Sequence, residues 1–345
     1  MYISLHSSGH GFKSRGNEEK LMQIAAAIAK IARLWPLSLP PSMISYWENL
    51  LILVSTPLYV LIILGEILLS NYRHKPVYSV KDTLTNAYMM LLNAGIDVLF
   101  RSVYLLVLVY VFKHRFGQIS NPLVYWLVLL IAEDFIFYWL HRLEHTVRMF
   151  WAVHVTHHSS ELFNFTVGFR SSVLQPLYRF VFFIPLALFG FNPTDILIMF
   201  SATQIWGILV HTQFIKKMGW AEYVLVTPSH HRVHHASNAL YLDKNMGMFL
   251  IVWDKLFGTF QAELDEQKYQ PIRYGLTSKQ PERNALTVVT HEWQAIAEDL
   301  QKPVPFFTKL KYLLAPPGWS HDGSRHTSDE LRQLEAKGQW QPDNN

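Results

Sequence analysis

The sequence predicts an all-α integral membrane protein with about four to five membrane helices and a histidine-rich helical cytosolic cap. Half of the 345 residues are hydrophobic and 16% are charged, whereas about a quarter of the residues in soluble domains are charged. The apolar residues form long runs, and most of the 17 histidines cluster at the ends of these runs. The absence of cysteine excludes disulfides, thiolate-bound metals and iron–sulfur clusters. A formal net charge of +4 is too small to indicate a nucleic-acid partner.

The first 42 residues are expected to be an N-terminal extension. A possible helix over residues 21–35 is too short and too basic to cross a bilayer, so we expect it to lie at the membrane interface. No small-residue cleavage site follows a clean apolar core, so no signal peptide is recognised. Two prolines at positions 40–41 end the region before the first long apolar run.

Three apolar segments are long enough to cross a bilayer, which takes about 20 residues. The first covers residues 47–69 and the second covers 84–112. Asp97 and Arg101 interrupt the second segment four residues apart, so they can pair on one helix face. The third segment, residues 122–140, begins with a proline, which is favoured at the first position of a helix. Each segment is therefore predicted to be a membrane helix.

Two further apolar segments are predicted to form a helical hairpin. They cover residues 173–190 and 194–210, and the turn Gly-Phe-Asn-Pro at 190–193 separates them. The chain then becomes polar, which predicts a membrane oxidase domain over residues 43–260 and a C-terminal region with amphipathic helices over 261–345. Lysine and arginine flank nearly every span, so the positive-inside rule gives little information on orientation.

Histidines are concentrated in two short windows, residues 141–158 and 230–235, which hold nine of the 17. Within these windows the histidines recur three or four positions apart. On a helix this spacing places neighbouring side chains on one face, about 5–6 Å apart. A purification tag or a loose surface site does not recur at helical spacing beside membrane spans. The histidines form three sets, which are 141 and 145, then 154, 157 and 158, then 231, 234 and 235. We therefore interpret these three sets as metal ligands.

Two histidines near these sets need separate treatment. His211 directly follows the last apolar segment, residues 194–210. A hairpin would return it to the side of the membrane where the third segment ends, so we include it among the candidate ligands. His230 falls off the spacing of its neighbours, so we expect it to support a ligand. The candidate metal ligands are His141, His145, His154, His157, His158, His211, His231, His234 and His235.

The third apolar segment also contains a candidate acid. Asp134 lies seven residues before His141 and shares a helical stripe with it and with Tyr138. A carboxylate within a bilayer span is expensive and usually functional. We therefore expect Asp134 to hydrogen-bond a ligand imidazole and fix its tautomer, and we name Asp134 and Tyr138 as candidate catalytic residues. The alternative is that the acidic pair Glu133 and Asp134 balances Arg101 or Arg179.

The number of imidazoles fits two metal ions better than one. Imidazole suits zinc, copper, iron and nickel, but only a redox-active pair could use dioxygen to break an unactivated C–H bond of a lipid, which favours iron. No glycine-rich dinucleotide fingerprint is present, so the electron donor should be external. A membrane metal transporter is the alternative from another class, although its ligands would be expected near the middle of the spans.

The three histidine sets form motifs that resemble a known family. They read His-Arg-Leu-Glu-His at 141–145, His-Val-Thr-His-His at 154–158 and His-Arg-Val-His-His at 231–235. This pattern is similar to the histidine boxes of the fatty acid hydroxylase/sterol desaturase superfamily, and the resemblance covers about residues 132–260. Within the superfamily, the residues that follow the second and third boxes look most like the alkylglycerol monooxygenase branch and its bacterial relatives.

The resemblance implies a non-haem di-iron, dioxygen-dependent enzyme that acts on a lipid C–H bond. It implies a catalytic cap on the cytosolic face of about four membrane helices, and an external reductant, either a redox protein or tetrahydrobiopterin. All of the candidate ligands except His211 correspond to the family's iron ligands. Thr146 stands where the alkylglycerol monooxygenase branch has glutamate, so sterol or fatty-acyl desaturation and bacterial lipid hydroxylation remain alternatives.

Overall fold

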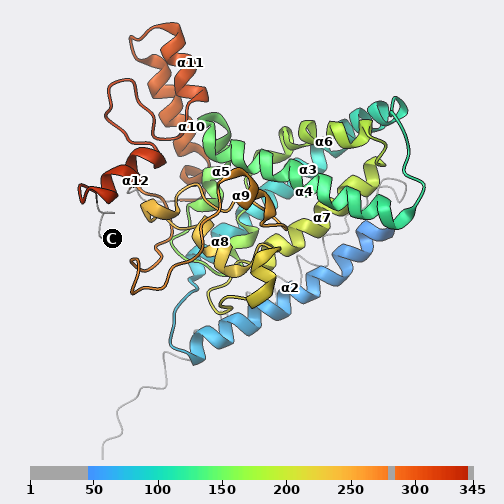
Figure 1. The fold of residues 1–345 in the computed structure, drawn as a ribbon, viewed down its shortest axis with the longest axis horizontal. Helices are drawn as coiled ribbons and strands as arrows, with labels where there is room; N and C mark the ends of the chain where they lie inside the picture. Colours follow the sequence, from blue (N-terminus) through green and yellow to red (C-terminus); the bar gives the residue numbers. More distant parts are fainter. Residues whose placement is uncertain (1–45, 279–283, 341–345) are drawn as a thin grey trace, which may run out of the picture. The chain divides into compact units, whose positions relative to one another are not determined.

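The structure, a computed structural model, describes residues 46–278 and 284–340 (Figure 1). Within these residues the chain is helical, and β-structure is limited to two isolated bridges, which confirms the all-α class. The N-terminal extension and its expected interfacial helix lie outside the described residues. The chain divides into two units between Leu58 and Tyr59, and all nine candidate metal ligands lie in the second unit.

Three helices in the described part are long and apolar enough to cross a membrane, and they match the three long segments expected from the sequence. They are α2 (Tyr46–Tyr72), α3 (Val80–Lys113) and α4 (Pro122–Thr146). Side-chain caps fix where the last two begin, because Ser79 and Asn121 each accept a hydrogen bond from a backbone N–H of the first turn.

The expected hairpin is present as two shorter helices, α6 (Arg179–Leu188) and α7 (Pro193–Leu209). Both have fewer than the roughly 20 residues that a full span takes, so the number of spans agrees only roughly with the sequence prediction. The turn between them requires Gly190, whose φ is 97°. A Cβ at this position would lie 2.2 Å from the carbonyl oxygen of Gly117, so no other residue fits without movement.

Helices α3, α4, α6 and α7 share one apolar core, which includes Phe137, Phe183 and Phe200. The end of α4 continues through Val147 into α5 (Arg148–His158), which carries the second histidine box. The remaining α-helices are α8 (Pro228–His234), α9 (Val252–Phe257), α10 (Ala285–Gln301), α11 (Phe306–Leu314) and α12 (Ser328–Ala336).

Within the described residues, four 3₁₀ helices of three to five residues connect these elements. They are η1 (Val167–Phe169), η2 (Gln175–Leu177), η3 (Gly219–Tyr223) and η4 (Ala239–Tyr241). Figure 1 shows α10 and α11 running together beside α5, with α12 near the chain's C-terminal end. The C-terminal helices therefore cover the end of the helix bundle where the histidines lie.

Candidate metal centre

Nine histidines form two neighbouring groups, and only His157 is not fully buried. Within each group, one ligand-capable nitrogen per histidine lies within 4.8 Å of the others. The groups adjoin each other, because the ring centroids of His158 and His235 are 4.5 Å apart. The first group is His141, His145, His154, His158 and His234, and the second group is His157, His211, His231 and His235. All nine candidate ligands are thus brought together.

The helices divide each of the last two boxes between the groups. In α5, His154 and His158 point to the first group, and His157 points to the second. In the third box the order is reversed, since His231 and His235 join the second group and His234 joins the first. Residues four apart stay together because they lie almost directly above one another on a helix, whereas the histidine between them is rotated to one side.

Backbone carbonyls orient four of these imidazoles from outside. A carbonyl oxygen can only accept, so the Nδ1 atom that faces it carries the proton, and Nε2 keeps a lone pair. The four pairs are His141 Nδ1 with Met246 O at 2.8 Å, His157 Nδ1 with Arg170 O at 3.0 Å, His211 Nδ1 with Gly207 O at 2.7 Å, and His234 Nδ1 with Lys244 O at 3.0 Å.

The Nε2 atoms inside each group lie in positions that neutral imidazoles would not favour without a bound cation. Nε2 of His211 lies 2.9 Å from Nε2 of His231 and 3.1 Å from Nε2 of His235. In the first group, the Nε2 atoms of His145 and His234 are buried without a hydrogen-bond partner. Unprotonated nitrogens that face one another at this distance repel, and buried polar atoms without a partner are costly. A cation among them would remove both penalties, so the donor set fits bound metal ions.

The protonation state of the ligands also suits metal binding. Burial, reinforced by neighbouring imidazoles, lowers the pKa of the histidines on α5 and α8 below the usual value, to about 4 for His157. Burial has the same effect on the pKa of His211. These imidazoles are therefore neutral at pH 7, and the neutral form is the one that coordinates metal.

Two carboxylates contact the Nδ1 atoms of two imidazoles in the first group. Oδ1 of Asp243 lies 3.1 Å from Nδ1 of His145. Oε2 of Glu144 lies 3.2 Å from Nδ1 of His154, which also faces Oγ of Ser172 at 2.8 Å. Sequence reasoning missed the role of Asp243, since nothing in the pattern links residues 98 positions apart. In the second group, the Nδ1 atoms of His157 and His211 face backbone carbonyls and no carboxylate. The two groups therefore differ electrostatically.

The expected contact between Asp134 and a ligand imidazole is not what the structure shows. Its carboxylate accepts hydrogen bonds from the backbone N–H groups of residues 249 and 250 and from Nε1 of Trp253. The sequence favoured an imidazole because a helical stripe gives direction along α4 but does not show which loop packs against it. Asp134 instead holds the loop that brings Met246 O to His141.

Other expected residues also have identifiable partners. The hydroxyl of Tyr138 bonds Thr259 at 2.9 Å and accepts from Arg142. Glu133 accepts from Thr203, and the arginines considered as its partners, Arg101 and Arg179, bind Asp97 instead. His230 lies outside both groups and contributes to the N-terminal cap of α8.

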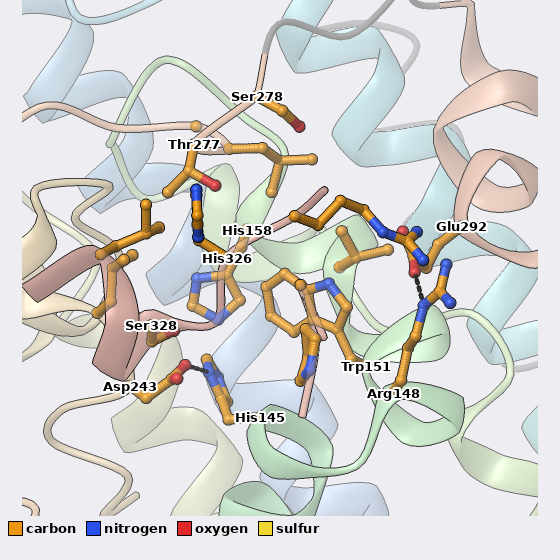
Figure 2. Close-up of a pocket in the computed structure, with 18 of the residues that line it drawn as sticks. His145, Arg148, Trp151, His158, Asp243, Thr277, Ser278, Glu292, His326 and Ser328 are labelled. Carbon is orange, nitrogen blue, oxygen red and sulfur yellow. Dashed lines mark hydrogen bonds and ion pairs between the residues drawn. The ribbon is translucent and has the colours of Figure 1, made fainter. Parts of the chain in front are cut away.

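A cavity of about 340 Å³ is lined by His145, His158 and His234 of the first group and by His235 of the second. Figure 2 shows His145 and His158 on one side of it, with Trp151 between them and the ion pair of Arg148 and Glu292. Side chains from the C-terminal region, such as Ser328, complete the wall. The first group can therefore be reached by a polar molecule from outside the apolar helices.

Comparison with known proteins gives the family of the region that holds the histidines. Residues 126–259 match the family model described as fatty acid hydroxylase. The chain contains a fatty acid hydroxylase domain. This domain begins within α4 and ends just after α9, so it includes all nine histidines, and the family predicted from the boxes is confirmed. The C-terminal wall of the cavity lies beyond the matched residues.

Relatives of the fatty acid hydroxylase domain include several lipid-modifying enzymes. The chain is 33% identical to alkylglycerol monooxygenase of Homo sapiens over 288 residues, which cover 82% of this chain and 63% of that protein. It is 32% identical to ornithine lipid hydroxylase OlsE of Rhizobium tropici, over 40% of this chain and 43% of that protein. It is 28% identical to Delta(7)-sterol 5(6)-desaturase ERG3B of Gibberella zeae, over 40% of this chain and 42% of that protein.

The chain thus spans less than two thirds of the length of these curated relatives. No solved structure matches it. Together, the three apolar helices and the membrane-enzyme relatives identify a membrane protein with a candidate metal centre at the end of a membrane helix.

Proposed function

We propose that this chain is a membrane-bound non-haem di-iron enzyme that uses dioxygen to hydroxylate a C–H bond of a lipid. The observation that carries the proposal is the pair of adjoining all-histidine groups at the end of the apolar helix α4. The names of the relatives, which include a monooxygenase and a lipid hydroxylase, support the reaction class. The proposal places the active site on the cytosolic face.

Each histidine group would hold one ion. A bound iron pair supplies the redox chemistry that lets dioxygen react with an unactivated C–H bond, which zinc could not do. Neutral imidazoles would leave such ions electron-poor, because they add no negative charge. The carboxylates of Asp243 and Glu144 would raise the basicity of two imidazoles in the first group only. Under this proposal, the two ions are chemically unequal.

Aromatic side chains separate the proposed reaction site from water. Phe163 is fully buried and stacks on His211 with ring centroids 5.5 Å apart. Trp151 lies against His158 at 5.6 Å. Two other aromatic residues near the first two histidine boxes pack elsewhere, Trp139 against Phe257 and Phe150 against Tyr178.

Asp134 and Tyr138 are proposed as positioning residues. The carboxylate of Asp134 fixes the loop whose carbonyl orients His141. The hydroxyl of Tyr138 is held by Thr259, which in turn bonds Asp254, and the carboxylate of Asp254 accepts the N–H of Met246. Both residues therefore act on the same imidazole through the backbone, without touching it.

The substrate and the electron donor enter this proposal from different sides. The lipid chain would approach laterally between the apolar helices. Electrons would come from an external donor, either a redox protein or tetrahydrobiopterin, and the polar cavity beside His145 offers a route to the first group.

Desaturation of a sterol or fatty acyl chain is the second candidate function, since one relative is named a sterol desaturase. It would remove a second hydrogen in place of adding a hydroxyl group. A metal transporter fits less well, because its ligands would lie along the depth of the spans, whereas the nine histidines gather at one end of α4.

Oxygen uptake and lipid mass spectrometry test the proposal. The purified chain, loaded with iron, is given membrane lipid and a reductant. Hydroxylation adds one oxygen to a lipid, and desaturation removes two hydrogens. His158→Ala should abolish the product, and His114→Ala, an exposed histidine at the end of α3, should not. Transport of metal into vesicles without oxygen uptake would refute the proposal.

A further inference from the structure

We propose that α11 is an interfacial anchor that seats its exposed apolar face in the surface of an anionic lipid bilayer. This inference requires that the chain is a membrane protein, but it is independent of the oxidation reaction. It concerns a helix that lies outside the fatty acid hydroxylase domain.

The apolar side of α11 is unusually exposed for so short a helix. Phe306 and Phe307 are 73% and 77% exposed, and Leu310 and Leu314, one and two turns further on, are 37% and 50% exposed. Tyr312 faces the other way and is fully buried against the protein. Aromatic and leucine side chains on the outer face of an amphipathic helix are typical of helices that lie in the membrane interface.

The charged residues within α11 are both basic. They are Lys309 and Lys311. Asp299 and Asp322 lie outside the helix, and Lys302 pairs with Asp299. Lysines close to a membrane surface are attracted to anionic lipid. By contrast, α12 carries three acidic residues and no large exposed apolar side chain. The basic and apolar features therefore coincide on α11.

Hydrogen bonds fix α11 at the level where a membrane helix ends. Arg148 comes two residues after the end of α4. Its backbone N–H donates to the carbonyl oxygen of Ala315 at 3.1 Å, directly after the end of α11. Its guanidinium donates to Asp299 of α10 at 2.6 Å. The end of α11 is therefore held close to the boundary between bilayer and water.

The neighbouring helix α10 lies against a membrane helix as well. Val288 and Val289 of α10 pack in one cluster with Met89 and Leu92 of α3, and these two residues are within a candidate span. Figure 1 shows α10 and α11 side by side. The exposed face of α11 is thus next to a bilayer, and lipid is the occupant that its position, apolar side chains and charge all favour.

The absence of cysteine allows a direct test with single labels. Phe307→Cys is labelled with an environment-sensitive fluorophore in the full chain, reconstituted into phosphatidylcholine vesicles that contain about one quarter phosphatidylglycerol. Brominated lipids then quench fluorophores that lie in the bilayer. Leu99→Cys, 72% exposed on α3, reports on a membrane helix, and Gln333→Cys, exposed on α12, is the polar control.

We expect the label at position 307 to be quenched at least about threefold more strongly than the label at position 333, as for an interfacial helix. Neutralisation by Lys309→Gln and Lys311→Gln in the same labelled chain should reduce this quenching in anionic vesicles. Equal quenching at 307 and 333, while the label at Leu99 is quenched, would overturn the proposal, and so would protection of position 307 by a protein partner or second copy. None of these readouts depends on enzymatic activity.

Discussion

Replacing Asp243 by asparagine is expected to weaken the binding of one metal ion and spare the other. The carboxylate lies 3.1 Å from Nδ1 of His145, whose Nε2 is buried among the first group without a partner. Burial alone would raise the pKa of Asp243, but hydrogen bonds from His145 and Ser328 hold this pKa below its usual value. The carboxylate is therefore ionised, and an anion behind an imidazole strengthens the bond between that imidazole and a metal.

Asparagine isolates the effect of charge at this position. Asp243 has a φ of 52°, and asparagine tolerates this left-handed region as aspartate does, whereas alanine would add strain. Loss of such an outer partner costs about 10–100-fold in metal affinity. Only one of five imidazoles in the first group is affected, and an amide oxygen still accepts a hydrogen bond. We therefore expect about a tenfold loss, or about 1.4 kcal/mol.

A chelator titration measures this effect. The iron that each chain retains is determined as the chelator concentration is raised. The variant should release one ion at about tenfold lower chelator than the wild type and the second ion unchanged. Asp322→Asn is the matched control, because this exposed carboxylate accepts hydrogen bonds from Ser324. Release of both ions together, or a curve identical to that of the wild type, would refute the reasoning.

Four other substitutions test separate parts of the structure. His234→Ala should remove the ion of the first group and His235→Ala that of the second, so each purified variant should retain about one ion; loss of both from each would mean that the groups are not independent. Gly190→Ala should lower the free energy of unfolding by about 1–3 kcal/mol, seen as a lower melting temperature, because its φ of 97° is strained for alanine. Asp299→Asn should cost about 1–3 kcal/mol. Although burial alone would raise the pKa of Asp299, hydrogen bonds from its three cationic partners lower it to about 2, so this stabilisation is present at neutral pH and is lost as the pH falls toward 2; an unchanged melting temperature at pH 7 would contradict it.

The sequence predicted the features that depend on local pattern. Long apolar runs identified α2, α3 and α4, because crossing a bilayer imposes a length and a composition that few other structures need. Histidine spacing identified the candidate ligands, because residues three and four apart on a helix must be neighbours. The hairpin at Gly190 was also visible, since a glycine–proline turn is a strong break between helices.

The sequence could not predict features that depend on contacts between distant segments. Asp243 reaches His145 through a loop, and Asp134 is bound by the loop near Trp253 instead of by an imidazole. For Asp134, the position on the helix indicated a direction without a partner, and for Asp243 the sequence pattern gave no signal. The length of α6 was overestimated, because hydropathy does not distinguish a short helix and its apolar flanks from a full span, whereas α7 has the expected length.

The division of the histidine boxes between two groups has a structural consequence. Because α5 and α8 each contribute to both groups, two rigid helices determine the distance between the proposed ions, and loops do not need to. His141 on α4 belongs to the first group alone, and His211 after α7 belongs to the second alone. Changes near these two residues should therefore alter one site at a time, whereas bending α5 or α8 would change the spacing of the pair. Two metal ions that must act together on dioxygen require that spacing to be fixed before the substrate arrives.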